Sequence, residues 1–372
     1  MDRFDVTVIG GGVIGLAVAR RLSLDGLQTV LVEKEASFGN HTSSRNSEVI
    51  HSGIYYPENS LKHILCIEGR EELYRLCEKT GIPYNKTGKL IVACSEDEKQ
   101  ELNRLYDNGR KNGLKDIKYV SSSEAAKLCP GIICIEALHL GYTGLIDSHQ
   151  LMKYFLMESE KNGCICVFSS EAVETSHINR GYIIQTKSAD EAEFSFLSDI
   201  VINSAGLDAD IVAARAGIDV KSNGYAQHYC KGSYFRVSGL KNRFQMPVYP
   251  AVPESDPGLG IHITPDLAGE VRLGPDAQYL EVRNKDYSVE GSLRKRFFDS
   301  VVNFFPGLDE KKMVSDTSGI RPKLQGQGEK FRDFVIQEEK GNGFPGFINL
   351  IGIESPGLTA CTAIAEKVRG LI

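Results

Sequence analysis

The chain contains no tryptophan and only five methionines, and none of its hydrophobic runs is long enough to cross a membrane without interruption. Its most apolar N-terminal stretch, Val6–Leu24, is broken by glycines and by two arginines, which favours a strand, a turn and a helix. Acidic residues precede this stretch and no small-residue cleavage site follows it, so it is not typical of a signal peptide. We therefore expect no transmembrane segment, and a location in the cytoplasm or an organelle matrix.

The sequence also lacks paired cysteines at zinc-site spacing, so we expect no metal site. Its nine cysteines are scattered, and an odd, dispersed set is typical of reduced thiols in an intracellular compartment. The net charge of -6 argues against general nucleic-acid binding. The 372 residues, of which 41% are hydrophobic, are enough for a large core and for about two domains.

What the sequence does contain is a βαβ pattern at its start. Phe4–Ile9 is an apolar run typical of a buried strand, and glycines follow it. Val13–Asp25 then has apolar residues at helical spacing, and Gly26 ends the predicted helix. Leu27–Glu33 is a second β-rich run. This pattern is the expected frame of a dinucleotide-binding fold.

The glycines between that strand and helix form the pattern G-x-G-x-x-G. They allow the backbone to approach a pyrophosphate, and the helix N-terminus offers free N–H groups to it. Glu33 ends the second strand, where a carboxylate accepts hydrogen bonds from a ribose diol and repels a 2′-phosphate. This favours FAD or NAD over NADP. The predicted residues of this half-site are Gly10, Gly12, Val13, Ile14, Gly15, Glu33 and Lys34.

Two later segments favour FAD over NAD. The loop 40–47 is dense in small hydrogen-bond donors, and 351–360 reads as a strand, a glycine turn and a helix at the far end of the chain. A second helix N-terminus can hold the electron-rich edge of a reduced flavin. The predicted cofactor residues of the two segments are Thr42, Ser43, Ser44, Arg45, Asn46, Ser47, Gly352, Glu354, Ser355, Pro356, Gly357, Leu358 and Thr359.

Between these ends, helical and strand patterns alternate as far as Ala216. Tyr229–Leu273 then turns mostly to strand, Ser292–Phe305 is a predicted helix, and Phe347–Ile353 is a predicted buried strand before a last helix, Leu358–Leu371. The strand-rich stretch indicates that a second domain interrupts the nucleotide domain.

Further motifs are spread along nearly the whole chain. They are Ser43–Pro57, Ser60–Lys62 with Cys66 and Gly69, Gly88–Ala93, Thr143–Asp147, Lys231–Phe235, Gly260–Pro265, Leu273–Ala277 and Gly319–Pro322. Together they resemble the D-amino-acid-oxidase-like superfamily of FAD-dependent oxidoreductases, and within it the L-2-hydroxyglutarate dehydrogenase and oxidase family most of all. The long block Ser43–Pro57 is the most specific part of this resemblance.

The resemblance implies an α/β chain, α+β overall, of the glutathione-reductase-like DAO type. A Rossmann-like FAD-binding domain from residues 1–84, 142–220 and 311–372 would be interrupted by a mostly antiparallel β-sheet substrate domain from 85–141 and 221–310.

The resemblance also adds cofactor residues. Asn203–Gly206 resembles the second FAD fingerprint of the superfamily, and Val173 resembles its backbone contact to adenine. The cofactor residues implied in this way are Val173, Ser204, Ala205, Gly206 and Gly319.

The implied reaction is oxidation of an L-2-hydroxy acid, most of all L-2-hydroxyglutarate, to a 2-oxo acid. The hydrogen on Cα leaves as a hydride to flavin N5, and a base takes the hydroxyl proton. A histidine is the natural base near neutral pH, and His51 and His262 lie in the two motifs expected to border the flavin.

The substrate carboxylate needs a cation, best an arginine that makes two parallel hydrogen bonds. Arg321 resembles the superfamily's carboxylate-binding arginine. For a second carboxylate, Lys231, Ser233 and Tyr234 are candidates, and Lys89 is less favoured. We therefore expect a small-molecule carboxylate as the partner.

Other functions stay open at this point. An amine or amino-acid oxidase of the same fold, acting on glycine, sarcosine or a D-amino acid, would need no hydroxyl base. Aerobic glycerol-3-phosphate oxidation would need several cations for the phosphate, and few are obvious. A flavoprotein with no enzymatic role is the alternative from another class. The electron acceptor can be oxygen, a quinone or a carrier protein.

Overall fold

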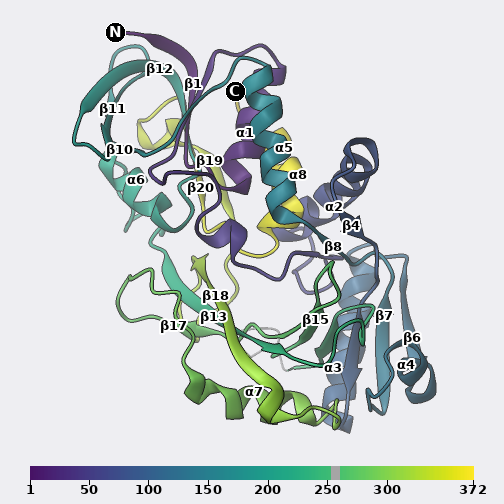
Figure 1. Cartoon of the computed structure of the whole chain (residues 1–372). Helices are drawn as coiled ribbons and strands as arrows, with labels where there is room; N and C mark the ends of the chain where they lie inside the picture. Colours follow the sequence, from purple (N-terminus) through teal and green to yellow (C-terminus); the bar gives the residue numbers. More distant parts are fainter. Residues whose placement is uncertain (253–259) are drawn as a thin grey trace.

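The first apolar run forms strand β1, which lies inside an eight-stranded sheet of the computed structural model. The structure describes residues 1–252 and 260–372, and Figure 1 shows its two lobes. β1 pairs in parallel with β2 on one side and with β12 on the other. In the described residues this sheet comprises β1 (Arg3–Ile9), β2 (Thr29–Val32), β9 (Ile165–Val167), β10 (Ser170–His177), β11 (Tyr182–Ser188), β12 (Glu193–Asn203), β19 (Val335–Glu338) and β20 (Phe347–Ile351).

Strand β12 connects two kinds of pairing. Its first half pairs antiparallel with β11, while Val201 to Asn203 pair in parallel with β20 from the end of the chain. The pairing of β10 with β11 shifts between Ala172 and Glu174, which leaves Val173 in a bulge without a paired residue on β11.

Helices cover both faces of this sheet because its central strands are apolar on both sides. Val6 and Val8 of β1 face a core shared with α1 (Val13–Leu24), α5 (Ser148–Lys161) and α8 (Gly357–Arg369), which run side by side in Figure 1. Ile9 faces the opposite core, which contains α6 (Ala209–Arg215).

The second lobe is built on a nine-stranded sheet in the part of the chain that the structure describes. Its pairings are antiparallel except between β14 and β5. Its strands are β5 (Leu90–Ala93), β6 (Ile117–Ser121), β7 (Glu136–Leu140), β13 (His228–Val237), β14 (Val248–Pro250), β15 (Ile263–Pro265), β16 (Val271–Leu273), β17 (Gln278–Tyr279) and β18 (Met313–Lys323). The helices near it are α3 (Glu96–Lys111), α4 (Ser122–Leu128) and α7 (Arg294–Val302).

A small third sheet and one long helix lie outside the two large sheets. The small sheet pairs β3 (Val49–Ile50) and β4 (Tyr84–Asn85) with β8 (Gly144–Ile146). Helix α2 (Leu61–Thr80) packs on α8, and α8 also contacts β3, which immediately precedes His51.

Two expectations differ from the structure in detail. The predicted helix Ser292–Phe305 is shorter in the structure, where α7 ends at Val302. Pro306 follows a few residues later, and a proline disfavours helical backbone at the residue before it. The expected boundary at residue 311 does not coincide with a change of sheet. β18 pairs along β13 in the nine-stranded sheet, and only from β19 onward does the chain join the eight-stranded one.

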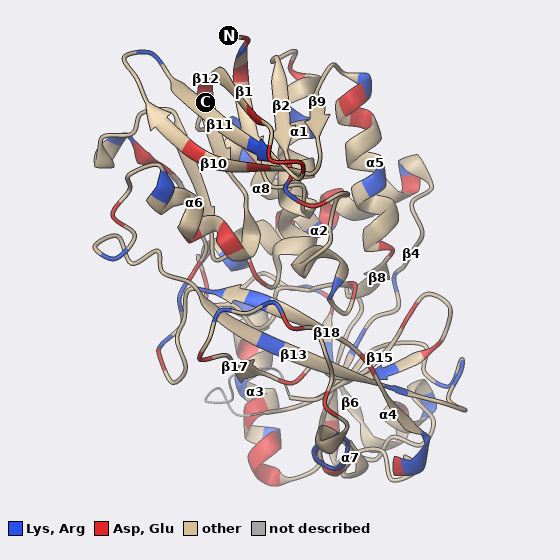
Figure 2. Ribbon diagram, turned by 60° about the vertical axis from the view of Figure 1, so that its left-hand side comes forward, with Lys and Arg blue, Asp and Glu red and all other residues tan. Residues whose placement is uncertain are grey.

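Within residues 1–252 and 260–372, no helix is both long enough and apolar enough to span a membrane. The same residues contain no group of three or more His, Cys, Asp or Glu placed to hold a metal ion. All nine cysteines are free thiols. Acidic and basic residues are interspersed over both lobes in Figure 2.

The crossing of α2 over α8 gives a test of the fold. A Cβ on Gly69 would lie 2.3 Å from the Thr359 carbonyl oxygen and 2.7 Å from the Ala360 Cα, both backbone atoms that cannot rotate away. We expect Gly69→Ala to lower the free energy of unfolding by about 1–3 kcal/mol, measured by urea denaturation. Gly291→Ala is the matched control, because a Cβ there meets no atom within 4 Å. Equal midpoints for the two variants would contradict this packing.

Candidate active site and cofactor site

The turn between β1 and α1 has room for backbone only. A Cβ on Gly10 would lie 2.5 Å from the Ser204 carbonyl oxygen, and Gly10 has φ +109°. A Cβ on Gly15 would lie 1.9 Å from the Gly10 carbonyl oxygen. Gly12 stands at the N-terminus of α1 without a side chain to cap it. The first turn of α1 contains Val13, whose N–H donates to Ser43 Oγ at 3.0 Å, and Ile14, and the positive end of the helix dipole there favours a bound anion.

A carboxylate stands where the ribose is expected. Glu33 follows β2, and its Oε2 accepts a hydrogen bond from the Gly11 N–H at 2.6 Å. Its Oε1 accepts from the Glu35 N–H at 2.8 Å. These two bonds fix the carboxylate at the mouth of the glycine turn, with lone pairs left for a diol.

A cavity joins these groups to segments far away in the sequence. It lies at the ends of β1, β2 and β12, as expected for a nucleotide site in an open α/β sheet. The residues that line it are Ile9, Gly10, Gly12, Val32, Glu33, Lys34, Gly39, Asn40, His41, Thr42, Ser43, Ser170, Glu171, Ala172, Ser204, Ala205, Gly206, Leu207, Asp208, Ile211, Val212 and Arg215.

The loop after β2 splits between two places. Thr42 and Ser43 line the cavity, and Ser43 Oγ accepts a hydrogen bond from the Val13 N–H at 3.0 Å. Ser44, Arg45, Asn46 and Ser47 are not among the lining residues. Asn46 donates to the Ser43 carbonyl at 2.7 Å and so fixes the loop. The Arg45 guanidinium lies 4.0 Å from the centre of the Tyr287 ring.

The second fingerprint lies against the first. Ser204, Ala205 and Gly206 line the cavity, and Ser204 Oγ donates to the Ile9 carbonyl at 2.8 Å. Val173 does not line it, but its neighbour Ala172 does. The bulge leaves Val173 without a paired residue on β11.

Basic residues from both lobes meet at the edge of the cavity. Lys34 Nζ and Lys285 Nζ lie 2.6 and 2.7 Å from Asp208 Oδ2. His41, which lines the cavity, has Nδ1 2.7 Å from the Tyr287 hydroxyl. Lys285 and Tyr287 lie in none of the motifs from which cofactor residues were predicted, so the sequence did not indicate that either lies near the cofactor site.

The turn before α8 lies at a different place from this cavity. Gly352 has φ +72°, and its N–H donates to Gln227 Oε1 at 2.8 Å. Glu354 is buried, and its carboxylate lies 2.9 Å from Lys62 Nζ and 3.6 Å from Lys323 Nζ. The two lysines lower the pKa of Glu354 against the opposing effect of burial, so the carboxylate stays charged. Pro356, Gly357 and Leu358 lead from this turn into α8.

His51 is held against the start of α8. Its backbone N–H donates to Thr359 Oγ1 at 3.0 Å, and its Nε2 lies 3.3 Å from Ser355 Oγ. Among the described residues its Nδ1 has no hydrogen-bond partner. Burial lowers the pKa of His51 to about 3, and the charge of Lys89 adds to this effect. The ring is therefore uncharged near neutral pH.

The second candidate base lies on an aromatic wall. The His262 ring stacks on Tyr249 of β14, with centroids 3.6 Å apart and planes 5° apart. His262 is 4% exposed, and its carbonyl accepts a hydrogen bond from the Gly274 N–H at 2.9 Å.

Arg321 extends from β18 towards the neighbouring strand β13. Its two terminal nitrogens donate to the Asp276 carbonyl at 3.1 and 3.2 Å, and a Cβ on Gly232 would lie 2.9 Å from Nη2. Gly319, on the same strand, packs on the backbone of Arg45. A Cβ added to Gly319 would lie 2.0 Å from the Arg45 carbonyl oxygen. The guanidinium therefore has N–H groups left to bind a carboxylate.

The other predicted substrate groups have partners within the protein. Tyr234 and Ser47 are joined through their hydroxyls, 3.0 Å apart. Lys231 Nζ lies 3.2 Å from Asp286 Oδ2. The backbone N–H of Ser233 donates to Asp276 Oδ1 at 2.7 Å.

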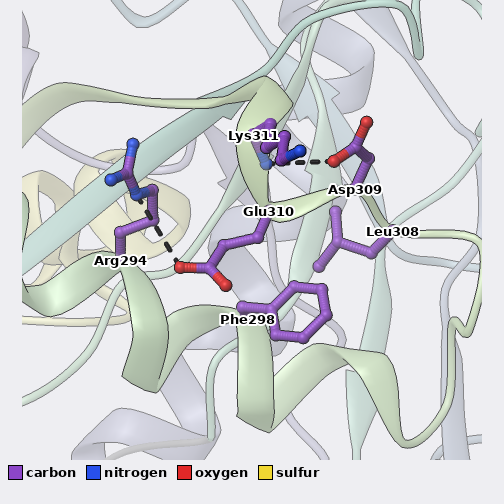
Figure 3. Close-up of a pocket in the computed structure, with 6 residues that line it drawn as sticks. All are labelled: Arg294, Phe298, Leu308, Asp309, Glu310 and Lys311. Atoms are coloured by element: carbon purple, nitrogen blue, oxygen red, sulfur yellow. Dashed lines mark hydrogen bonds and ion pairs between the residues drawn. The ribbon is translucent and has the colours of Figure 1, made fainter.

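A separate hollow of about 550 Å³ lies between α7 and residues 308–311 (Figure 3). Arg294 and Glu310 form an ion pair across it at 3.9 Å. None of the predicted site residues lines it, so we assign it no role in the reaction.

Comparison with known proteins gives a consistent picture. The family model described as FAD dependent oxidoreductase (DAO) matches residues 5–371. The mitochondrial L-2-hydroxyglutarate dehydrogenase of Arabidopsis thaliana is 38% identical over 406 residues, which cover 99% of this chain and 83% of that protein. The L-2-hydroxyglutarate dehydrogenase of Indibacter alkaliphilus is 28% identical and covers 98% of each protein.

Solved structures agree on the fold. Dithionite-reduced L-α-glycerophosphate oxidase from Mycoplasma pneumoniae, with FAD bound, has a TM-score of 0.88 and 27% identity, covering 100% of this chain and 95% of that one. Glycine oxidase from Geobacillus kaustophilus has a TM-score of 0.81 at 20% identity, with the same coverage, and shows the fold alone. The expected DAO-type fold is confirmed, and FAD is the cofactor.

The position of Glu33 leads to a test of the nucleotide site. We expect Glu33→Gln to raise the dissociation constant of FAD roughly tenfold to a hundredfold, because a hydrogen bond to a charged group contributes about 1.5–3 kcal/mol. Titration of the apoprotein with FAD, followed by quenching of flavin fluorescence, measures it. Glu193→Gln, an equal change of charge at an exposed strand end, is the control. Unchanged FAD affinity in Glu33→Gln would remove Glu33 from the site.

Proposed function

The chain belongs to the DAO family of FAD-dependent oxidoreductases, and on that premise we propose that it oxidises L-2-hydroxyglutarate to 2-oxoglutarate. The observation that carries the proposal is similarity over 99% of the chain, at 38% identity, to a protein with L-2-hydroxyglutarate dehydrogenase as its name. The buried His262 and the half-buried His51 and Arg321, near the cofactor-binding segments, support it, because a hydroxy acid needs a base and a carboxylate partner.

His51 is our candidate for the base. FAD, when bound, accepts the hydride from C2 of the substrate at flavin N5. The hydroxyl proton goes to His51, whose Nδ1 has no partner among the described residues and whose Nε2 is oriented by Ser355. His262 is the alternative base, since it is buried and its ring stacks on Tyr249.

Arg321 is our candidate for binding the carboxylate beside the reacting carbon. Arg321 is half-buried, and its guanidinium is already oriented by the Asp276 carbonyl, which reduces the entropy lost on binding. For the second carboxylate we propose Lys231 and Tyr234, from the neighbouring strand β13. Lys231 would exchange its exposed partner Asp286 for the substrate.

We also propose a division of labour between the lobes. The lobe with the eight-stranded sheet would hold FAD, because its strand ends line the nucleotide cavity. The lobe with the nine-stranded sheet would hold most substrate groups, since Arg321, Lys231 and His262 belong to it or border it. The relatives named mitochondrial, together with nine free cysteines, support an organelle matrix or the cytoplasm as the location.

Oxidation of glycerol 3-phosphate is the second candidate. The FAD-bound glycerophosphate oxidase, with its TM-score of 0.88, favours it. The supply of cations near Arg321 argues against it, because a phosphate needs several: Lys231 could exchange its exposed partner Asp286, but Lys323 is held by the buried Glu354. Amine and amino-acid oxidation rests on the fold alone, through glycine oxidase.

Anaerobic mixing tests the substrate directly. We expect millimolar L-2-hydroxyglutarate to bleach the visible absorption of the bound flavin, since hydride transfer reduces it. D-2-hydroxyglutarate, glycerol 3-phosphate, glycine and sarcosine should leave the band unchanged. Reoxidation by oxygen, a quinone or a carrier protein then identifies the acceptor. No bleaching by L-2-hydroxyglutarate, or bleaching by glycerol 3-phosphate alone, would refute the proposal.

Arg321→Lys tests the carboxylate site. A lysine keeps the charge but loses the paired donors, so we expect KM for L-2-hydroxyglutarate to rise roughly tenfold to a hundredfold. Steady-state kinetics measure KM, and the flavin spectrum checks cofactor loading. Arg236→Lys, on the exposed side of β13, is the control. A KM equal to that of the control would exclude Arg321 from substrate binding.

A further inference from the structure

The guanidinium of Arg321 is held at one end by the turn between β16 and β17. Nη1 and Nη2 both donate to the Asp276 carbonyl, at 3.1 and 3.2 Å. Nη1 also donates to Sγ of Cys230, which pairs with Arg321 across β13 and β18, at 3.7 Å. These contacts direct the edge formed by Nε and Nη2 away from both acceptors. That edge can give a carboxylate two parallel hydrogen bonds.

A glycine on β13 lets the guanidinium lie against the strand. A Cβ on Gly232 would lie 2.9 Å from Arg321 Nη2, 3.1 Å from Nη1 and 2.8 Å from Pro275 Cβ. The guanidinium and Pro275 therefore occupy the space in which another residue would carry its side chain. Because its end and the side towards β13 are both in contact with the protein, the guanidinium loses little freedom when a carboxylate binds.

The carboxylate of Asp276 fixes the carbonyl to which Arg321 donates. This side chain is only 5% exposed. Its Oδ1 accepts a hydrogen bond from the Ser233 N–H of β13 at 2.7 Å, and its Oδ2 forms an ion pair with Arg296 of α7. The first contact ties residue 276 to the strand beside Arg321, and the second ties it to a helix. Since carbonyl and carboxylate belong to one residue, holding the side chain restrains the carbonyl.

The same turn also contacts the segment of the alternative base. The Gly274 N–H donates to the His262 carbonyl at 2.9 Å, and a Cβ on Gly274 would lie 2.5 Å from the Ser233 carbonyl oxygen. Gly274 has φ +119°, which residues with a side chain rarely adopt. Residues 274–276 therefore run tightly between the His262 segment and β13, and this close fit sets the position of Asp276.

Asp276 itself is not oriented to react with a substrate. One of its carboxylate oxygens accepts from the Ser233 N–H, and the other is paired with Arg296. A general base needs an oxygen within hydrogen-bond reach of the proton that it removes. The contacts of Asp276 lead instead to Arg321, so its effect on a substrate passes through the arginine.

We propose that Asp276 is a positioning residue for Arg321, and that its carbonyl turns the Nε–Nη2 edge of the guanidinium towards the carboxylate of the substrate. The orientation of the guanidinium follows from the contacts just described. That the ligand is the carboxylate of an L-2-hydroxy acid rests on the proposed function.

Arginine NMR tests the positioning without any substrate. In holoenzyme labelled with 15N at arginine Nε, Arg321→Lys assigns the signal of Arg321. We expect an order parameter of about 0.8 for its N–H bond in the wild type, as in ordered backbone. In Asp276→Asn an amide N–H group can face the Arg296 guanidinium, so the ion pair is lost. The order parameter of Arg321 should then fall below about 0.6.

Two further variants serve as control and as reserve. Asp316→Asn is the matched control, because Asp316 lies on the same strand as Arg321 and pairs with Arg236 and Arg272 at 3.0 and 2.9 Å. It should leave the Arg321 signal unchanged. Arg296→Gln removes the partner whose side chain is 54% exposed, and it takes the place of Asp276→Asn if that variant fails to fold or to bind FAD.

Steady-state kinetics give the second readout. With L-2-hydroxyglutarate, we expect KM to rise roughly tenfold in Asp276→Asn and about twofold to fivefold in Arg296→Gln. The value of kcat should change by less than about threefold, because the arginine binds the carboxylate equally in the ground state and in the transition state. Asp316→Asn should retain the wild-type KM.

A double variant shows whether the effect passes through Arg321. Arg321→Lys already lacks the two parallel donors, so adding Asp276→Asn to it should raise KM by no more than about twofold. If Asp276 only stabilised the lobe, its tenfold effect would appear again in the Arg321→Lys background.

An Arg321 as ordered in Asp276→Asn as in the wild type would overturn the inference, whatever the substrate is; the same result in Arg296→Gln decides if Asp276→Asn does not fold. Multiplied KM effects in the double variant, or an unchanged KM beside a loosened Arg321, would also overturn it. A loosened Arg321 in an enzyme whose wild type does not oxidise L-2-hydroxyglutarate would support the positioning and refute the proposed substrate instead.

Discussion

The arrangement of the residues around His51 depends on the backbone contact between α2 and α8. Gly69 lets the two helices approach until only a hydrogen atom fits between them. That approach brings Thr359 within reach of the His51 N–H, and it brings Ser355 to the imidazole. The N-terminal loop and the C-terminal turn can therefore serve one cofactor. If α2 and α8 were further apart, each segment could keep its own conformation, but the contacts of His51 with Thr359 and Ser355 would be lost.

The parts of the site that depend on local backbone could be predicted from the sequence. The glycine turn, Glu33 and the last strand and helix follow from period, spacing and the steric needs of a pyrophosphate, and the structure has a strand, a turn and a helix at these places. Val173 is a different case. It was implied by resemblance only, and its bulge is visible only once β10 is paired with β11.

The parts that depend on long-range pairing could not be predicted. Lys62 and Glu354 are 292 residues apart, and nothing in either segment indicates that they form a buried ion pair. Lys89 Nζ lies 4.6 Å from the centre of the Tyr55 ring and 4.3 Å from that of the Tyr249 ring. The two rings come from a loop and from a strand far apart in the sequence, so these contacts appear only in the folded chain. The sheet that β18 joins is decided by its pairing with β13 and not by a local pattern.

The strand order also determines when, during translation, each strand of the eight-stranded sheet can pair with its neighbours. β1 leaves the ribosome before both of the strands that follow in this path: its neighbour β12 ends at Asn203, and the partner of β12, β20, ends at Ile351. At about 5–20 residues per second, many seconds separate these events. The glycine turn is thus made before β12 and β20, and it is among the last parts to be enclosed. During that interval the apolar faces of β1 and α1 are uncovered, and a chaperone has its best opportunity to bind there.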